Sequence, residues 1–383
     1  MDRKYSQTND CVDILETLEL ETIINAGGTK SRYGGRPIRP RVREAIQQMW
    51  NYAVDLEELN AAVGKAIGAL TGSEAGLVVN GAAGGTMLAT AAVIAKCNSI
   101  HKHETVPFQA TKNEFVILRS HWGQYSYLIE NAGGKLKGAG YVNRASIEHV
   151  ESSIGPETCG IIFVAGPGIS SIGPSLEEIA ETARSREISL FVSAAATLPP
   201  RSNLQKFIEQ GADIVTASGG KYLGCTQTSG LLFGKRDLLE RASSMMHPNH
   251  GIGRALKVSK EDIIAMYVAL HDYCDEDEER QLANESDALA PYATRISNET
   301  DFVAEIKHDR FRHFYPCITI GFQHRPEIAA LICSRLLTGK PRVFVRHFED
   351  IAEIAIERSC CDHDDFEIAI DRLLHVLVDA SIP

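Results

Sequence analysis

The fold of this chain is constrained most by a regular alternation of short apolar runs and helical patterns between residues 75 and 235. Runs rich in Val, Ile, Leu and Phe predict strands, and apolar residues at helical spacing predict the helices between them. This alternation indicates an α/β fold with a mostly parallel, seven-stranded-type sheet flanked by helices. The predicted strands are 76–79, 114–118, 135–136, 160–164, 189–192, 214–217 and 230–233, and the predicted helices are 84–97, 123–132, 146–153, 175–186 and 203–210.

The 383 residues are enough for two domains. Residues 1–60 are expected to form an N-terminal arm and a helix that contribute to the smaller domain, and residues 61–285 the large α/β domain. Residues 286–383 have a different pattern that predicts a small C-terminal α+β domain. Its predicted strands are 302–306, 317–322, 342–345 and 351–356, and its predicted helices are 325–337 and 364–379.

Charge and cysteine spacing argue against several classes of function. The chain has 39 Lys and Arg against 50 Asp and Glu, and this net charge of −11 disfavours a nucleic-acid partner. Its nine cysteines form no CxxC pair and no regular spacing, so neither a metal site nor a disulfide framework is expected. With no signal peptide and no apolar run long enough to cross a bilayer, a cytoplasmic protein without a membrane partner is expected.

A glycine-rich turn follows the first strand of the predicted sheet. Asn80-Gly81-Ala82-Ala83-Gly84-Gly85-Thr86 opens a helix of small residues. Free backbone amides at a helix start, here those near Ala82, Ala83 and Gly84, can hold a phosphate. A tight turn that lets the helix pack closely on the sheet is an equally good interpretation of the same glycines.

A lysine lies just after another predicted strand, in Ser218-Gly219-Gly220-Lys221. Burial among apolar and small residues would lower the pKa of its amine and make it a nucleophile that can form a Schiff base. Alternatively, the side chain reaches solvent from an ordinary turn. The Ser218 hydroxyl likewise suits either a bound phosphate or a local hydrogen bond within the turn.

His121 follows the strand 114–118 and precedes Trp122. A histidine there can stack on a flat ligand or act as an acid or base, and a surface or capping role is the alternative. Pyridoxal 5′-phosphate combines a phosphate, a flat ring and an aldehyde that reacts with a lysine. A phosphate cradle, a ring and a lysine at one sheet edge therefore favour this cofactor.

The chain resembles the fold-type I pyridoxal-phosphate enzymes, in the branch of selenocysteine synthase and D-glucosaminate-6-phosphate ammonia-lyase. The motifs occur in the order found in that branch, from about residue 23 to residue 270, and their combination is specific. The matching stretches are 24–29 with 34–35, 80–85, 119–121, 195–200, 211–215, 218–221 with Gln227 and Gly230, and 250–257 with 260–261.

The resemblance implies that Lys221 is the Schiff-base lysine and that His121 stacks on the pyridine ring. The amides near Ala82, Ala83 and Gly84 would hold the phosphate together with Ser218. Ser193 and Ala195 would line the cofactor pocket.

For the substrate, the resemblance implies a small amino acid whose anionic group is held by Arg36, Arg254 or Lys257. A guanidinium pairs with a carboxylate through two hydrogen bonds, which favours the arginines. The resemblance also implies a homodimer or higher homo-oligomer with active sites at subunit interfaces.

One departure from the family pattern affects the expected chemistry. Ser193 occupies the position at which the family has an aspartate paired with the pyridine nitrogen, and Cys225-Thr226 replaces the family's Gly-Pro after the lysine. A serine hydroxyl forms only a neutral hydrogen bond, so the cofactor would withdraw electrons less strongly.

An α,β-eliminating lyase is the leading expectation for the reaction. Racemisation, β-replacement and aldol-type cleavage remain open, and so does a non-catalytic or regulatory homologue. Selenium transfer to tRNA is disfavoured by the acidic charge balance.

Overall fold

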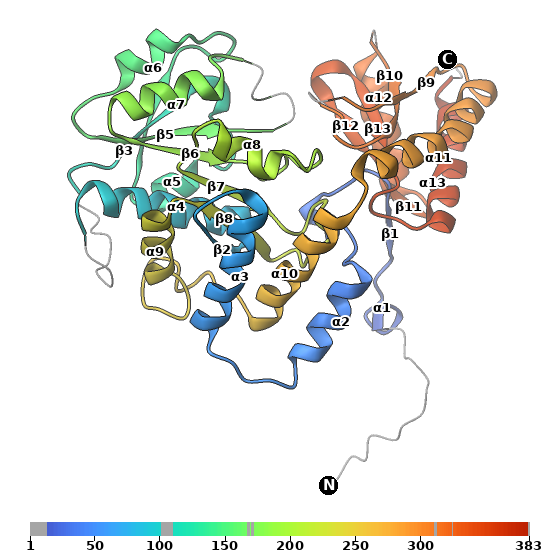
Figure 1. Ribbon diagram of the computed structural model, residues 1–383. Coiled ribbons are helices and arrows are strands. Elements are labelled where there is room, and N and C mark those ends of the chain that lie inside the picture. Colours follow the sequence, from blue (N-terminus) through green and yellow to red (C-terminus); the bar gives the residue numbers. More distant parts are fainter. Residues whose placement is uncertain are drawn as a thin grey trace. The chain divides into compact units, whose positions relative to one another are not determined.

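The computed structural model describes residues 14–100, 110–166, 169, 172–309, 312–323 and 325–381 (Figure 1). The chain forms two compact units. The larger comprises Thr29–Ala288 and Lys307–Pro316, and the smaller comprises Met1–Gly28, Leu289–Ile306 and Cys317–Pro383.

This division differs from the sequence-based one at the N-terminus, where residues 1–60 were expected to contribute to the smaller domain. Residues 29–60 belong to the larger unit, because α2 (Pro40–Met49) packs along α10 (Lys260–Asp275) and α3 (Leu56–Thr71) packs on the first strand of the large sheet. Only the short segment before residue 29 joins the smaller unit.

The larger unit is built on a seven-stranded sheet with strand order β2-β8-β7-β6-β5-β3-β4. β8 runs antiparallel to both of its neighbours, and the other strand pairs are parallel. The expected mostly parallel sheet is confirmed. The strands are β2 (Ala75–Asn80), β3 (Glu114–Leu118), β4 (Lys135–Ala139), β5 (Thr158–Val164), β6 (Ser189–Ser193), β7 (Ile214–Ser218) and β8 (Ser229–Gly234).

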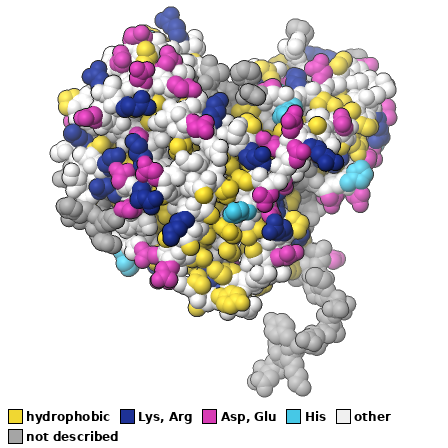
Figure 2. All heavy atoms as spheres, in the orientation of Figure 1, with side chains coloured by type: hydrophobic (Ala, Val, Ile, Leu, Met, Phe, Trp, Pro, Cys, Tyr) yellow, Lys and Arg dark blue, Asp and Glu magenta, His cyan; other side chains and the backbone are white. Residues whose placement is uncertain are grey.

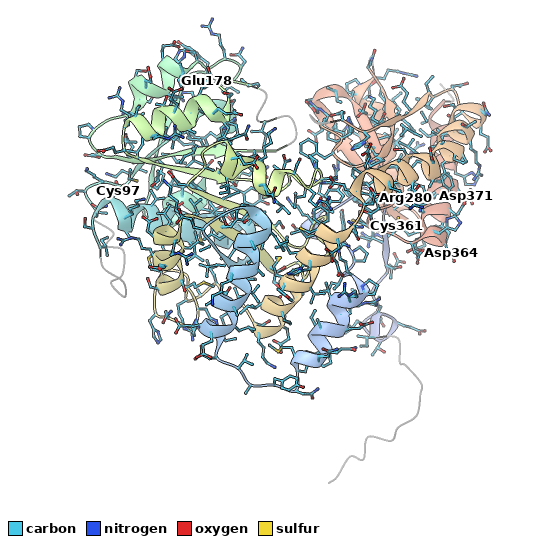
Figure 3. The ribbon with its side chains drawn as sticks, viewed as in Figure 1. Cys97, Glu178, Arg280, Cys361, Asp364 and Asp371 are labelled. Atoms are coloured by element: carbon cyan, nitrogen blue, oxygen red, sulfur yellow. The ribbon has the colours of Figure 1, made fainter. Side chains whose placement is uncertain are left out.

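Helices follow the strands as the alternation predicts, and their ends carry ordinary stop and start signals. At the start of α7 (Leu176–Ser185), Ser175 and Glu178 form a capping box: the Glu178 amide donates to the Ser175 hydroxyl at 3.2 Å, and the Glu178 carboxylate accepts from the Ser175 amide at 2.7 Å. Glu178 is labelled in Figure 3. The remaining helices of this unit are α4 (Gly81–Cys97), α5 (Tyr127–Asn131), α6 (Ile147–Ser153), α7 (Leu176–Ser185), α8 (Asn203–Glu209) and α9 (Arg236–Met245), with 3-10 turns at Ser31–Tyr33 and Arg119–His121.

The core of the larger unit lies between the sheet and these helices. α4 is buried along most of its length and on more than one side, as expected for a helix rich in small and apolar residues. Phe115, Phe191 and Phe233 are fully buried on the sheet. This rigid platform holds the loops at the strand ends.

The smaller unit has its own core and two small sheets. A four-stranded sheet has the order β12-β13-β10-β9, and β1 pairs in parallel with β11. The predicted strand 342–345 corresponds to β11, which ends at Phe344, and a second short strand, β12, begins at Arg346 and joins the other sheet. The helix α11 (Glu278–Glu299) begins in the larger unit and enters the smaller one at Leu289. The other elements of the smaller unit are α1 (Ile14–Thr17), β1 (Ile23–Asn25), β9 (Ala304–Lys307), β10 (Cys317–Gly321), α12 (Pro326–Thr338), β11 (Arg342–Phe344), β12 (Arg346–Phe348), the 3-10 turn Glu349–Ile351, β13 (Glu353–Ile356) and α13 (His363–Ser381). None of the helices in the described part of the chain has the length and apolarity needed to span a membrane.

Candidate active site

The predicted site residues gather along one edge of the seven-stranded sheet. Asn80, Ser193 and Ser218 end three strands that run in the same direction, and His121 follows a fourth. β8 starts at the same edge, because Asn80 pairs with Ser229 and Ser218 pairs with Gly230. The sheet thus brings together side chains that are far apart in the sequence, at the edge where ligands of such folds bind.

The glycines at the start of α4 differ in the space around them. A Cβ on Gly85 would overlap with the Thr216 hydroxyl oxygen, so this glycine permits close packing of helix on sheet. Gly81 has φ +60°, and a Cβ there would meet nothing within 4 Å. The close-packing interpretation therefore holds for Gly85, whereas Gly81 leaves open space beside the helix start.

The first turn of α4 is not capped by its own Asn80. The side-chain Nδ2 of Asn80 instead donates to the Lys257 carbonyl at 2.9 Å. Ala82 and Gly84 are buried, whereas Ala83 is exposed. Backbone amides at this helix start are thereby available to an anion, supported by the helix dipole.

The lysine loop is compact and half-buried at Lys221. The Gly224 amide donates to the Lys221 carbonyl at 2.9 Å, and the Cys225 amide donates to the Gly219 carbonyl at 3.0 Å. A Cβ on Gly219 would overlap with the Ser229 hydroxyl, and a Cβ on Gly220 would lie 2.5 Å from the Gln227 Cα. The two glycines before the lysine are therefore required by the loop's packing.

His121 is buried, with 3% of its surface exposed. Its Nδ1 accepts the Val164 amide proton at 3.2 Å, and its ring meets Phe163 edge to face at 4.8 Å. Burial lowers the pKa of His121 to about 4, and the Ile169 carbonyl only partly opposes this. The ring is therefore neutral near pH 7, and its Nε2 has no partner in hydrogen-bond geometry among the described residues.

Ser193 lies at the end of β6, between the ends of β5 and β7. Its carbonyl accepts from the Ala165 amide at 2.9 Å, and its half-buried hydroxyl makes no hydrogen bond within the described part of the chain. Ala195 lies in the turn that follows, also half-buried. Both residues are thus at the same sheet edge as Ser218.

The three predicted anion-binding residues fall into two places. Arg36 lies beside the lysine loop, where its Nη1 donates to the Tyr222 carbonyl at 2.9 Å. Lys257 and Arg254 lie on the loop that is joined to the α4 start through Asn80. Burial and the positive charges of Arg254 and Lys257 lower the pKa of His247, which shows that cationic groups cluster in this loop.

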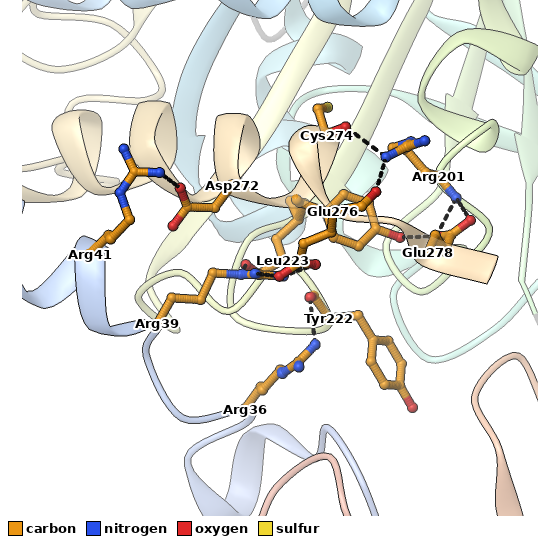
Figure 4. A network of polar contacts seen from close by, with 11 residues as sticks. Arg36, Arg39, Arg41, Arg201, Tyr222, Leu223, Asp272, Cys274, Glu276 and Glu278 are labelled. Atoms are coloured by element: carbon orange, nitrogen blue, oxygen red, sulfur yellow. Dashed lines mark hydrogen bonds and ion pairs between the residues drawn. The ribbon is translucent and has the colours of Figure 1, made fainter. Parts of the chain in front are cut away.

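Several residues near the lysine carried no signal in the sequence. Arg39, Arg201 and Glu276 belong to a polar network around the lysine loop (Figure 4). Tyr222 stacks on Tyr315 with ring centroids 5.0 Å apart. These partners come from distant segments, and no motif spacing relates them.

A cavity of about 1060 Å³ lies at the opposite, amino-terminal edge of the strands. It is lined by segments such as Gly72–Glu74 and Gly211–Asp213 and contains none of the predicted site residues. In the part of the chain that the structure describes, no cluster of three or more His, Cys, Asp or Glu side chains could hold a metal ion.

The seven-stranded sheet with one antiparallel strand and the appended small unit define the fold of the fold-type I pyridoxal-phosphate enzymes. The solved structure of D-glucosaminate-6-phosphate ammonia-lyase superposes with a TM-score of 0.81 at 23% identity, covering 96% of this chain and 99% of that one. Aspartate aminotransferase from Thermotoga maritima has the same fold, with a TM-score of 0.57 at 15% identity over 95% and 94% of the two chains.

Residues 36–305 match the model of the family described as SelA, L-seryl-tRNA selenium transferase. The chain belongs to this family. It is 26% identical to a 5'-C-glycyluridine monooxygenase-decarboxylase from a Streptomyces species, over 93% of this chain and 90% of the relative. It is also 26% identical to the D-glucosaminate-6-phosphate ammonia lyase of Salmonella typhimurium (strain 14028s / SGSC 2262), over 78% and 79% of the two chains.

Proposed function

We propose that this protein binds pyridoxal 5′-phosphate through Lys221 and catalyses α,β-elimination from a small amino acid. The observation that carries this proposal is the position of Lys221. It lies on the loop that follows β7. β7 pairs with β8, and Gly230 of β8 packs closely against the backbone of Gly81 at the start of α4. Membership of the SelA family supports the same cofactor.

The residues at the sheet edge fit this cofactor. The amides near Ala82, Ala83 and Gly84, with the Ser218 hydroxyl, would hold the phosphate. His121 is buried and neutral and directly follows β3 at the same sheet edge, where the family resemblance implies a ring that stacks on the pyridine. Ser193 and Ala195 would lie at the pyridine ring.

When bound, the cofactor withdraws electrons from the substrate's α-carbon. The protein's task is then to hold the substrate and move one proton. Lys221 would accept the α-proton of the substrate at Nζ. Arg36, or Arg254 with Lys257, would hold the substrate carboxylate or another anionic group.

Ser193 modifies this chemistry. It offers a neutral hydroxyl where the family has a carboxylate, so the ring nitrogen would remain uncharged and more electron density would stay at the α-carbon. Elimination would then depend on a good leaving group at the β-carbon. Racemisation, β-replacement and aldol-type cleavage are the other reactions that this set of residues permits.

A second candidate reaction is oxygen-dependent decarboxylation of an amino acid. It is favoured by the Streptomyces relative, which is named a monooxygenase-decarboxylase and aligns over 93% of this chain. Electron density retained at the α-carbon, as Ser193 would promote, suits reaction with oxygen. Uptake of oxygen with release of carbon dioxide would distinguish it from elimination, which releases ammonia and a keto acid.

Absorbance of the purified protein with added pyridoxal phosphate tests the proposal. We expect a Schiff-base band that borohydride bleaches, that K221A loses and that K235A keeps. Lys235 is the matched control because it pairs with Asp213 at the other end of β7. Absence of the band from the unmodified protein would refute cofactor binding through Lys221.

An amino-acid panel with ammonia, keto-acid, oxygen and carbon dioxide detection then identifies the reaction. Ammonia and keto acid without oxygen uptake would support the lyase. A bound cofactor with no spectral change and no product across the panel would favour the non-catalytic or regulatory homologue. S193D should alter the spectrum or the product distribution, and unchanged spectra and kinetics would show that this residue does not contact the ring.

We also propose that the protein is a homodimer or a higher homo-oligomer. Large hydrophobic side chains are exposed on the larger unit, including Trp50, Tyr52 and Val54 between α2 and α3. Figure 2 shows hydrophobic side chains gathered over this part of the larger unit. Such a patch marks an interaction surface. Light scattering after size-exclusion chromatography should give at least twice the mass of one chain, and a monomer at micromolar concentration would refute this proposal.

A further inference from the structure

The short segment from Arg36 to Arg39 donates four hydrogen bonds to the backbone of the lysine loop. The Arg36 amide donates to the Gly220 carbonyl at 3.2 Å, and the Arg39 amide donates to the Gly224 carbonyl at 3.0 Å. The Arg39 Nε donates to the Leu223 carbonyl at 2.6 Å. With the bond from Arg36 to Tyr222, four carbonyls around Lys221 accept hydrogen bonds from these two arginines.

Arg39 is itself fixed on its far side. Its two terminal nitrogens bind both carboxylate oxygens of Glu276, just after the end of α10, and its guanidinium lies 5.8 Å from the ring centre of Tyr273 (Figure 4). Only 12% of the Arg39 side chain is exposed. A two-point pair with little solvent access holds a guanidinium in one orientation.

The same helix end also holds the loop that follows β6. Nη1 of Arg201 donates to the carbonyls of Cys274 and Glu276 at 2.6 and 2.7 Å. The Arg201 amide donates to both carboxylate oxygens of Glu278 at 2.7 and 2.9 Å. The end of α10 therefore supports two loops, the one that follows β6 and the lysine loop.

We propose that Arg39 is a positioning residue for Lys221, acting through the backbone of residues 220–224 and oriented by Glu276. Arg39 touches neither the cofactor nor the substrate in this assignment. It sets the position of the lysine backbone, and hence where the amine can reach. This inference rests on the proposed role of Lys221 as the cofactor-binding residue.

The reason such support matters is geometric. The Lys221 amine has to reach two different atoms in turn, the cofactor aldehyde and the substrate's α-proton, from one backbone position. A small displacement of a catalytic group can reduce a rate by about a hundredfold.

The test compares R39Q and R39K with R41Q in the full-length, cofactor-loaded protein. Arg41 is a matched control, because it lies two residues from Arg39, in the first turn of α2, and pairs with Asp272 of α10. Its side chain is 70% exposed, and it makes no hydrogen bond to the lysine loop within the described part of the chain. Four quantities are measured: the dissociation constant of pyridoxal phosphate from absorbance titration, kcat and KM for the substrate that the amino-acid panel identifies, and amide hydrogen exchange of peptides covering 219–226.

We expect R39Q to weaken cofactor binding by about tenfold and to speed exchange of the loop amides by a similar factor, since two hydrogen bonds to the loop are lost or loosened. kcat should fall with KM little changed. R39K should not restore these values, because lysine cannot bind Leu223 and Glu276 at once through a planar fork. R41Q should match the unmodified protein.

Equal cofactor affinity and equal loop exchange in R39Q and R41Q would overturn the assignment, even if R39Q melted at a lower temperature. Full recovery in R39K would also overturn it. If R39Q does not fold, E276Q replaces it and should give a smaller change in the same direction. Should the unmodified protein form no Schiff-base band, the proposed function fails, whereas the exchange comparison still decides whether Arg39 holds the loop.

Discussion

The pKa of His121 leads to a prediction about stability between pH 4 and pH 6.5. The buried ring is neutral in the folded protein, with its pKa lowered from 6.5 to about 4. In this pH range the unfolded chain binds a proton that the folded chain does not, so the free energy of unfolding falls as the pH falls. This loss of stability is absent above about pH 6.5 and is complete by about pH 4.

The magnitude follows from the size of the pKa change. At about 1.4 kcal/mol for each pH unit, lowering the pKa from 6.5 to about 4 makes His121 responsible for about 3 kcal/mol of acid sensitivity. Because only 3% of His121 is exposed, solvent screening reduces this value little. The lowered pKa of His247 acts in the same direction, so a variant is needed to isolate His121.

Asn is the most informative substitution at position 121. Its side-chain oxygen can accept the Val164 amide as Nδ1 does, but it has no group that titrates between pH 4 and pH 6.5. Urea unfolding followed by tryptophan fluorescence, at half-unit pH steps from 4 to 7, gives the free energy of unfolding of both proteins. Both described tryptophans, Trp50 and Trp122, belong to the larger unit and report on its unfolding.

We expect H121N to be less stable at pH 7, because the buried ring is lost, and the difference between the two proteins to shrink by about 3 kcal/mol toward pH 4. Parallel curves for the two proteins across this range would refute the reasoning. They would show that His121 is protonated in the folded protein or that its pKa is not lowered.

Two further predictions concern packing and thiol reactivity. G85A should lower the free energy of unfolding, measured by urea, by about 1–3 kcal/mol, because its Cβ would overlap with the buried Thr216 hydroxyl. G123A is the control: a Cβ there has open space, so the free energy of unfolding should change by less than about 0.5 kcal/mol. Equal effects of the two substitutions would contradict the packing argument. A hydrogen bond with Cys159 lowers the pKa of Cys97 to about 7, whereas burial raises the pKa of Cys225 to about 11. Iodoacetamide at pH 7.5 should therefore label Cys97 before Cys225. Peptide mass spectrometry gives the order of labelling, and faster labelling of Cys225 would contradict it.

Local patterns in the sequence were sufficient for the secondary structure and for the positions of the chemistry-bearing residues. The seven strands of the large sheet and the helices between them follow from apolar periodicity, which depends on neighbouring residues alone. Lys221 and His121 could be singled out because each follows a predicted strand, whereas Ser193 was identified only through the resemblance to the family. The sequence also predicted that such residues meet, since parallel strands place their carboxyl ends at one edge.

The tertiary structure decided the features that depend on long-range pairing. It reversed β8 between two parallel neighbours, assigned the halves of 342–348 to different sheets and placed residues 29–60 in the larger unit. It also made Arg39 a partner of Leu223 and Glu276, which lie 184 and 237 residues away along the chain. No local pattern encodes such contacts, because they form only when the sheet and α10 have brought these segments together.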